Sequence, residues 1–73
     1  MDFKTLSDRL DNDFMHHVPK GDQGERYSKI RAAGKTMALL IKDLAPEGRE
    51  FSLALTKIDE AVFWANAAIA RNE

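Results

Sequence analysis

The side chains best suited to bind or transform a ligand lie in one short stretch, Phe14-Met15-His16-His17-Val18-Pro19-Lys20-Gly21. His16 and His17 could ligate a metal or contact an anion. Adjacent histidines reach one metal only from a bent backbone, however, and no HExxH spacing accompanies them. A catalytic role would need a positioned carboxylate or nucleophile, and the nearby aspartates have no spacing that singles one out. We therefore expect no metal site, no cofactor and no enzymatic activity.

Basic side chains offer a second kind of chemistry, the binding of phosphate. Lys20 precedes Gly21 near the predicted start of a helix, where free backbone amides and a positive charge would converge on an anion. The same helix carries Arg26, Lys29, Arg31 and Lys35. A solvated charged surface is the plain alternative for these four residues. The tripeptide Gly34-Lys35-Thr36 resembles the end of a Walker phosphate loop, but the earlier Gly is missing and the tripeptide lies within a helix.

Arg71 is the cation nearest the end of the last predicted helix, with Asn66 on a neighbouring face. A favourable interaction with the helix dipole is the simplest account of an Arg in this position. If several subunits bring this end of the chain together, the repeated Arg71 side chains would form a positively charged ring. Such a ring requires an anionic ligand or acidic neighbours.

A short helix and a loop precede the main helices. Phe3, Leu6 and Leu10 recur at helical spacing, which predicts a helix from Asp2 to about Leu10. The polar residues 11–13 then interrupt the pattern, and Pro and Gly follow. We expect a loop from there to the start of the next helix.

A long antiparallel helical hairpin is predicted for the rest of the chain. Asp22 and Glu25 match the two halves of a capping box at its start. Pro46 and Gly48 end the first helix and form a short connection, and the second helix runs from about Arg49 to Arg71. Each helix has one apolar stripe, formed by Tyr27, Ile30, Gly34, Met37, Ile41 and Leu44 and by Phe51, Leu55, Ile58, Val62, Ala65 and Ile69. The fold class is all-α, as a single domain over residues 1–73.

The second helix of the hairpin carries more apolar surface than one neighbour can bury. Phe63, Trp64 and the alanines at positions 54, 61 and 68 lie off its stripe. A domain of 73 residues buries only roughly 60% of its unfolded surface. Disulfides, metals and oligomerisation are the usual remedies, and a count of 0 Cys removes disulfides and thiolate metal sites. We expect a homo-oligomer.

Composition excludes several other classes of protein. A formal net charge of -1 argues against a dedicated duplex-binding protein, which would carry a strongly basic surface. No apolar run approaches the roughly 20 residues that span a bilayer. The amino-terminal segment is interrupted by the charged residues Asp2, Lys4, Asp8 and Arg9. It is therefore unlike a signal peptide, and we expect a cytoplasmic protein without a membrane partner.

Four blocks of sequence carry a resemblance to a known family. They are Glu25-Arg26-Tyr27, IRAAGK at 30–35, PEGRE at 46–50 and, most specifically, SLALTKIDEAVFWANAAIARN at 52–72. In these blocks the chain resembles the small phage anti-CBASS proteins that act as cyclic-nucleotide sponges, whose helical-hairpin domain also occurs in an anti-Thoeris sponge. The resemblance extends from about Phe14 to the last residue.

The resemblance implies a non-enzymatic hexamer that sequesters cyclic di- and trinucleotide immune signals in the infected bacterial cell and so blocks CBASS effector activation. Cyclic dinucleotides such as cyclic GMP-AMP would bind between paired subunits, and cyclic trinucleotides would bind where three subunits meet. The resemblance places Phe14, His16 and His17 near the bases or phosphates of the dinucleotide, Arg31 or Lys35 on a phosphate, and Arg71 at the trinucleotide site.

Two other interpretations remain open. The chain could be a protein-interaction or assembly module with no nucleotide ligand, whose cations are merely solvated. It could also bind linear nucleic acid through the basic residues of the second helix, which would give a steep dependence of affinity on salt. Binding to a panel of cyclic nucleotides distinguishes these interpretations.

Overall fold

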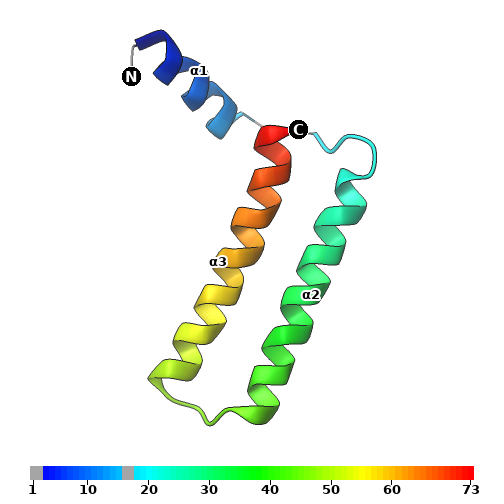
Figure 1. Cartoon of the computed structure of the whole chain (residues 1–73), viewed down its shortest axis with the longest axis vertical. Coiled ribbons are helices and arrows are strands. Elements are labelled where there is room, and N and C mark those ends of the chain that lie inside the picture. Colours follow the sequence, from blue (N-terminus) through cyan, green and yellow to red (C-terminus); the bar gives the residue numbers. More distant parts are fainter. Residues whose placement is uncertain (1–2, 16–17) are drawn as a thin grey trace.

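The computed structural model of the chain describes residues 3–15 and 18–73, and in these ranges it consists of helices without strands (Figure 1). Helix α1 spans Phe3–Phe14, α2 spans Gln23–Leu44 and α3 spans Arg49–Asn72. Helices α2 and α3 form an antiparallel hairpin, and α1 projects from the end of the hairpin where the carboxyl terminus lies. The predicted all-α class, with a short helix before a helical hairpin, is confirmed. His16 and His17 lie outside the described residues.

Helix α1 continues past Leu10, so the prediction that residues 11–13 end this helix is wrong. Asp13 faces Arg9 one turn earlier, with its Oδ2 3.7 Å from the Arg9 Nε. The Met15 amide donates a hydrogen bond to the Asp11 carbonyl at 3.0 Å. The Asn12 side chain donates to the backbone carbonyl of Arg71 in α3 at 3.1 Å. Contacts within the helix and to α3 therefore satisfy polar groups that, in the sequence, indicate a loop.

Helix α2 begins where the sequence predicts, but the capping box does not form. Asp22 is the N-cap residue, and its side chain makes no capping hydrogen bond to the backbone amides of the helix. Its carboxylate lies 3.3 Å from the Nε of Arg26, and Glu25 pairs with Lys29 at 3.2 Å. The side chains of Arg26 and Lys29, one turn further along the helix, thus bind the two carboxylates in place of the backbone amides that a capping box would use. Gly21 has φ 54, in the left-handed region that favours glycine, and this turns the chain into α2.

The connection between α2 and α3 follows from the residues at its centre. Ala45 is extended, with φ -113 and ψ 139, because the Pro46 ring disfavours a helical conformation of the residue before it. The Ala45 amide donates to the Ile41 carbonyl at 2.9 Å and completes the last turn of α2. Helix α3 then begins at Arg49, and the Ser52 amide donates to the Gly48 carbonyl at 3.1 Å.

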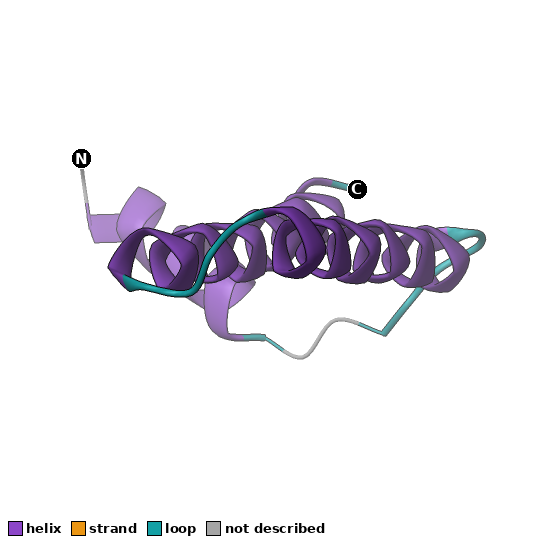
Figure 2. Ribbon diagram, turned by 90° about the horizontal axis from the view of Figure 1, so that it is seen from below, coloured by secondary structure: helices purple, strands orange, loops and turns teal. Residues whose placement is uncertain are grey.

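A close approach at Gly34 fixes the middle of the hairpin. A Cβ atom on Gly34 would lie 2.6 Å from the Cγ2 of Val62 and 3.6 Å from the Cγ2 of Ile58. Only glycine leaves room for these branched side chains. In Figure 2, α2 and α3 lie side by side in one layer.

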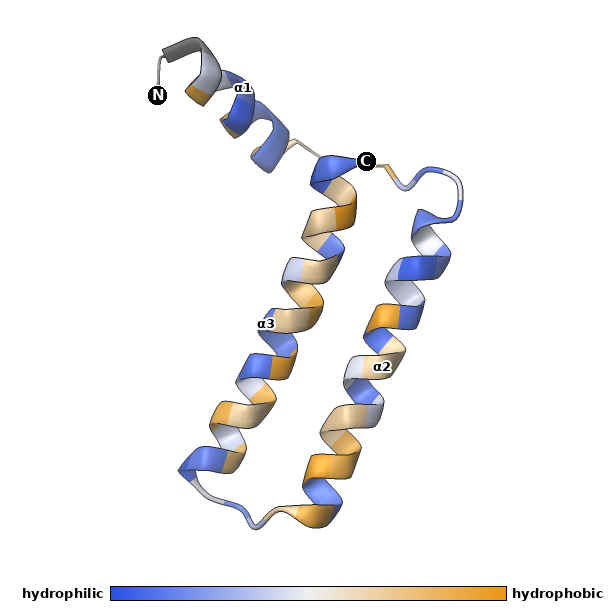
Figure 3. Cartoon of the chain, in the orientation of Figure 1, coloured by the Kyte–Doolittle hydropathy of each residue, from blue (hydrophilic) through white to orange (hydrophobic). Residues whose placement is uncertain are grey.

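This layer is too thin to enclose a hydrophobic core. The principal extents are 49 × 30 × 14 Å, and the shortest is close to the diameter of one helix, about 10–12 Å. No apolar side chain in the described part of the chain is buried, and Gln23 is the one buried residue there. Figure 3 shows apolar residues along much of α3 and in the part of α2 near the connection.

Two aromatic residues stand out on the exposed surface of α3. Phe63 and Trp64 are each 58% exposed, and their rings pack edge to face with centroids 5.0 Å apart. Leu39, Leu40 and Leu53 are also exposed. The hairpin thus presents apolar surface that its own elements leave uncovered.

Candidate functional site

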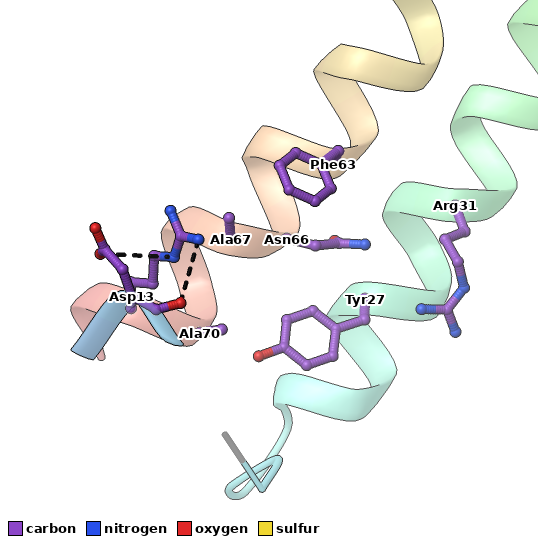
Figure 4. Close-up of a pocket in the computed structure, with 8 residues that line it drawn as sticks. Asp13, Tyr27, Arg31, Phe63, Asn66, Ala67 and Ala70 are labelled. Atoms are coloured by element: carbon purple, nitrogen blue, oxygen red, sulfur yellow. Dashed lines mark hydrogen bonds and ion pairs between the residues drawn. The ribbon is translucent and has the colours of Figure 1, made fainter. Parts of the chain in front are cut away.

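An open pocket of about 390 Å³ lies near the free end of the hairpin (Figure 4). Its walls come from all three helices. The lining residues are Asp13 of α1, Tyr27 and Arg31 of α2, and Phe63, Asn66, Ala67, Ala70 and Arg71 of α3.

Helical spacing brings the two α2 residues to this pocket. Tyr27 and Arg31 are four residues apart and so occupy one face of the helix. The ring of Tyr27 points from α2 toward α3, with its phenolic end near Ala70, while the Asn66 side chain points from α3 toward α2. Alanines at 67 and 70 leave space between these larger groups. The pocket therefore combines aromatic surface, hydrogen-bonding groups and a cation.

Arg71 forms the pocket wall nearest α1. Its Nε lies 3.8 Å from the Asp13 carboxylate, and its Nη2 donates to the Asp13 backbone carbonyl at 3.5 Å. These contacts orient one edge of the guanidinium toward α1. The side chain retains 32% of its exposure, so it stays accessible to a ligand in the pocket.

Arg31 is held more loosely than Arg71. Its Nη2 donates to the Ser28 hydroxyl at 3.1 Å, and that hydroxyl donates to the Gly24 carbonyl at 3.1 Å. Both contacts lie on the exposed surface of α2. Arg31 and Arg71 are thus two cations at the same pocket, and both can donate hydrogen bonds to an anion in the planar geometry that suits phosphate.

Asn66 contributes a hydrogen-bond acceptor with no partner in the described part of the chain. Its Oδ1 is shielded from solvent and accepts no hydrogen bond there. Buried polar atoms are nearly always paired in native proteins. An external donor would reach this oxygen only after the Asn66 side chain turns toward the open pocket.

The predicted site residues are only partly brought together within one chain. Arg31 and Arg71 line the same pocket. Lys35 lines a neighbouring hollow of about 290 Å³ that Arg31 also borders, together with Asp59. Phe14 is 83% exposed at the end of α1, beside Leu10 and Met15 in a third hollow. His16 and His17, the other two predicted site residues, lie outside the described residues.

Three polar lining residues, Tyr27, Asn66 and Asp13, were not predicted as site residues from the sequence. The sequence analysis assigns Tyr27 to the apolar stripe of its helix. The spacing of apolar residues places its aromatic ring but gives no information about its hydroxyl group. Asn66 carries a usable signal, since it is the polar residue within the apolar run at 61–70. Asp13 has no such signal, because its role depends on a contact between α1 and α3.

The free end of the hairpin is closed by an ion pair between Arg26 of α2 and Glu73. The Arg26 Nη1 donates to Glu73 Oε2 at 2.8 Å, and Nη2 donates to Oε1. The hydrogen bonds from Arg26 lower the pKa of Glu73 to about 2, although partial desolvation opposes this shift. The same hydrogen bonds raise the pKa of Arg26. Both groups therefore stay charged near neutral pH.

The chain matches the family described as Acb2/Tad1, hairpin domain, over residues 7–70. It belongs to this family. The match confirms the resemblance to anti-CBASS and anti-Thoeris sponges, and it includes Tyr27, Arg31 and Asn66 and ends directly before Arg71. No curated protein and no solved structure shows a significant match.

Two further findings on this Acb2/Tad1 hairpin concern metal sites and membrane-spanning helices. Among residues 3–15 and 18–73, no cluster of His, Asp or Glu side chains has the arrangement of a metal site. Within the same part of the chain, no helix is long and apolar enough to cross a membrane. The candidate pocket presents aromatic, amide, carboxylate and guanidinium groups.

Proposed function

We propose that this protein is a phage anti-defence protein that binds cyclic oligonucleotide immune signals and sequesters them without cleavage. Its ligands are cyclic dinucleotides such as cyclic GMP-AMP, and cyclic trinucleotides. Their removal from the cytoplasm of the infected bacterium prevents activation of CBASS effectors. The observation that carries this proposal is the Acb2/Tad1 family match over residues 7–70.

The chemistry of the pocket supports such a ligand. A cyclic oligonucleotide has flat bases and one negative phosphodiester group per nucleotide, so it needs stacking surfaces and cations. Tyr27 and Phe63 supply aromatic rings, and stacking of a base on such a ring contributes about 1–3 kcal/mol. Arg31 and Arg71 supply guanidinium groups for phosphate. Sequestration requires tight binding alone, without a catalytic acid or base.

We assign the individual residues to two separate pockets, one for cyclic trinucleotides and one for cyclic dinucleotides. Arg71 binds the phosphates of a cyclic trinucleotide. Phe14, His16 and His17 contact the bases or phosphates of a cyclic dinucleotide, with a phosphate held by Arg31 or Lys35. The position of Arg31 between the pocket of Arg71 and the hollow of Lys35 is compatible with either role.

The sponge is proposed to assemble as a homohexamer, and the surface of the single chain supports assembly. The chain exposes 6013 Å², whereas a compact monomer of 8.2 kDa would expose about 4500 Å². Burial of Phe63, Trp64 and the exposed leucines against other subunits would remove much of this excess. A solution mass of 8.2 kDa, that of one chain, would contradict assembly.

Calorimetric titration with a panel of cyclic di- and trinucleotides tests the function. We expect saturable binding of at least one class, and recovery of the intact cyclic ligand after the protein is denatured. Recovery of linear products would indicate a nuclease instead. Affinity for linear DNA or RNA that falls steeply with salt would favour nucleic-acid binding through α2.

The exposed apolar surface favours one alternative, a helical protein-interaction or assembly module with no nucleotide ligand. This alternative predicts a correctly assembled oligomer that gives no binding heat with any cyclic nucleotide at any temperature. The same titration therefore decides between the two functions.

A further inference from the structure

Three polar residues tie the start of α2 to the end of the chain, and we call them the end clamp: Gln23, Arg26 and Glu73. Both terminal nitrogens of Arg26 donate to the Glu73 carboxylate. The Gln23 Nε2 donates to Glu73 Oε1 at 3.4 Å, and the Gln23 Oε1 accepts a hydrogen bond from the Lys20 amide at 2.9 Å. Gln23 is 6% exposed. The clamp thus joins the loop before α2, the first turn of α2 and Glu73 through one buried amide.

The clamp lies directly beside the candidate pocket. Arg26 precedes Tyr27 in the chain, and Glu73 lies two residues beyond Arg71. The covalent connection of the hairpin is at the opposite end, and the close contact of Gly34 with Val62 holds its middle. At the pocket, α3 presents Ala67 and Ala70, whose small side chains leave the space between the two helices open. The separation of the helices at the pocket therefore depends on the clamp.

We propose that Glu73 is a positioning residue for nucleotide binding, which holds α2 against α3 through Arg26 and so sets the spacing between the pocket walls formed by Tyr27 and Asn66. This inference rests on the proposed function. It adds a residue that lies beyond the matched range 7–70.

The contacts of Arg26 distinguish it from the two pocket arginines, Arg31 and Arg71. Its terminal nitrogens are engaged by Glu73, and its Nε faces the Asp22 carboxylate at 3.3 Å. A phosphate would have to displace these carboxylates, whereas Arg31 and Arg71 both line the pocket. The sequence does not distinguish these three arginines, whereas in the structure both terminal nitrogens of Arg26 are bound to the Glu73 carboxylate.

Single exposed ion pairs stabilise proteins little, and the Arg26 and Glu73 side chains are 36% and 42% exposed. An ion pair contributes more when its geometry is bidentate and when it belongs to a larger network. The Arg26–Glu73 pair meets both conditions, because Gln23 is a buried third member of the clamp. The clamp is therefore expected to affect local position more than global stability.

Calorimetric titration of four variants with cyclic triadenylate and cyclic GMP-AMP tests the inference. Glu73→Gln removes the negative charge and one of the two oxygens that accept from Arg26, and Arg26→Gln removes the guanidinium. Glu25→Gln is the matched control, because it removes a carboxylate from the exposed Glu25–Lys29 pair on the same helix. Titrations are carried out well below the melting temperature of every variant, where all molecules are folded.

If loss of the clamp leaves about a tenth of the molecules with correctly spaced walls, the apparent Kd rises about tenfold. We expect this change for both clamp variants with at least one ligand, and an unchanged Kd for Glu25→Gln. We also expect the side-chain amide resonances of Asn66 to shift in the free clamp variants and not in the control. Arg26→Lys keeps the positive charge and loses the bidentate geometry, so we expect a Kd between those of the unaltered protein and of Arg26→Gln. If the other clamp variants do not fold, Arg26→Lys provides the test in their place.

An unchanged Kd in Glu73→Gln would overturn the inference, whether or not its melting temperature falls, because a purely stabilising pair lowers stability without affecting folded molecules. Equal weakening in Glu25→Gln would overturn it as well. If the unaltered protein binds neither ligand nor any other cyclic nucleotide, the proposed function itself fails.

Discussion

Arg71 is held against the carboxyl end of α1 by Asp13, whose carboxylate lies 3.8 Å from Nε and whose backbone carbonyl lies 3.5 Å from Nη2. The cation proposed to bind phosphate thus already has a negative neighbour, which Arg9 also contacts at 3.7 Å. A bound phosphate would share Arg71 with this carboxylate. The charge of Asp13 therefore opposes anion binding, while its carbonyl helps to orient the guanidinium.

Replacing Asp13 with Asn is expected to strengthen the binding of a cyclic trinucleotide. The change removes the opposing charge and keeps the backbone contact. A partly exposed charge pair corresponds to roughly 0.2–1 kcal/mol, so we expect Kd to fall by up to about fivefold. The gain should shrink as salt is added. Weaker binding of the Asp13→Asn variant by calorimetry would instead show that the carboxylate mainly positions Arg71.

Arg71→Ala is expected to weaken trinucleotide binding and to leave dinucleotide binding largely intact. Hydrogen bonds that involve a charged group contribute about 1.5–3 kcal/mol, so trinucleotide Kd should rise roughly 10- to 100-fold. Titration of both ligands against the same preparation provides the comparison. An equal loss for both ligands would refute separate pockets.

Gly34→Ala should destabilise the hairpin although alanine favours helices by about 1 kcal/mol. The new Cβ would lie 2.6 Å from the Cγ2 of Val62, and overpacking of this kind costs about 1–3 kcal/mol. Gly24→Ala is the matched control in the same helix, because its Cβ would make an ordinary 4.0 Å contact with Pro19. Chemical denaturation should show a loss at position 34 and a small gain at position 24. A gain at both positions would contradict the close approach of α2 and α3.

Acid should remove the stabilising contribution of the Glu73–Arg26 pair. The pKa of Glu73 is about 2 in the folded chain, below its ordinary value of 4.5, because Arg26 donates hydrogen bonds to its charged form. Its contribution is therefore complete above about pH 4.5 and is lost as the pH falls through 2. Asp22 is the other charged group that faces Arg26 in this cluster.

Melting temperatures of the unaltered protein and of Glu73→Gln, measured side by side between pH 6 and pH 2, provide the test. The difference between them should be constant near pH 6 and should vanish toward pH 2. A difference that grows on acidification would show that the Glu73 carboxylate is not held in its charged form.

The helical hairpin could be predicted from the sequence because its determinants are local. Apolar residues at alternating spacings of three and four define both stripes, and Pro46 with Gly48 marks the connection. The end of α1 could not be predicted, since Asn12 and Asp13 are polar residues whose partners include Arg71 in α3. The capping box failed because Arg26 and Lys29 attract the two carboxylates.

The candidate site was only partly predictable for the same reason. Charge and family resemblance identify Arg31 and Arg71, and the structure places both at one pocket. Pairing of Arg26 with Glu73 spans 47 positions, so no local pattern could indicate it. The Asn66 Oδ1, which accepts no hydrogen bond from residues 3–15 and 18–73, likewise becomes evident only when α2 and α3 lie together.

The most direct test of the central claim is a titration of the purified, assembled protein with cyclic GMP-AMP and a cyclic trinucleotide, followed by denaturation and analysis of the released ligand. Cyclic-nucleotide sequestration predicts saturable binding and quantitative recovery of the intact ring. The absence of binding to any member of a cyclic-nucleotide panel, or recovery of linear products alone, would contradict it.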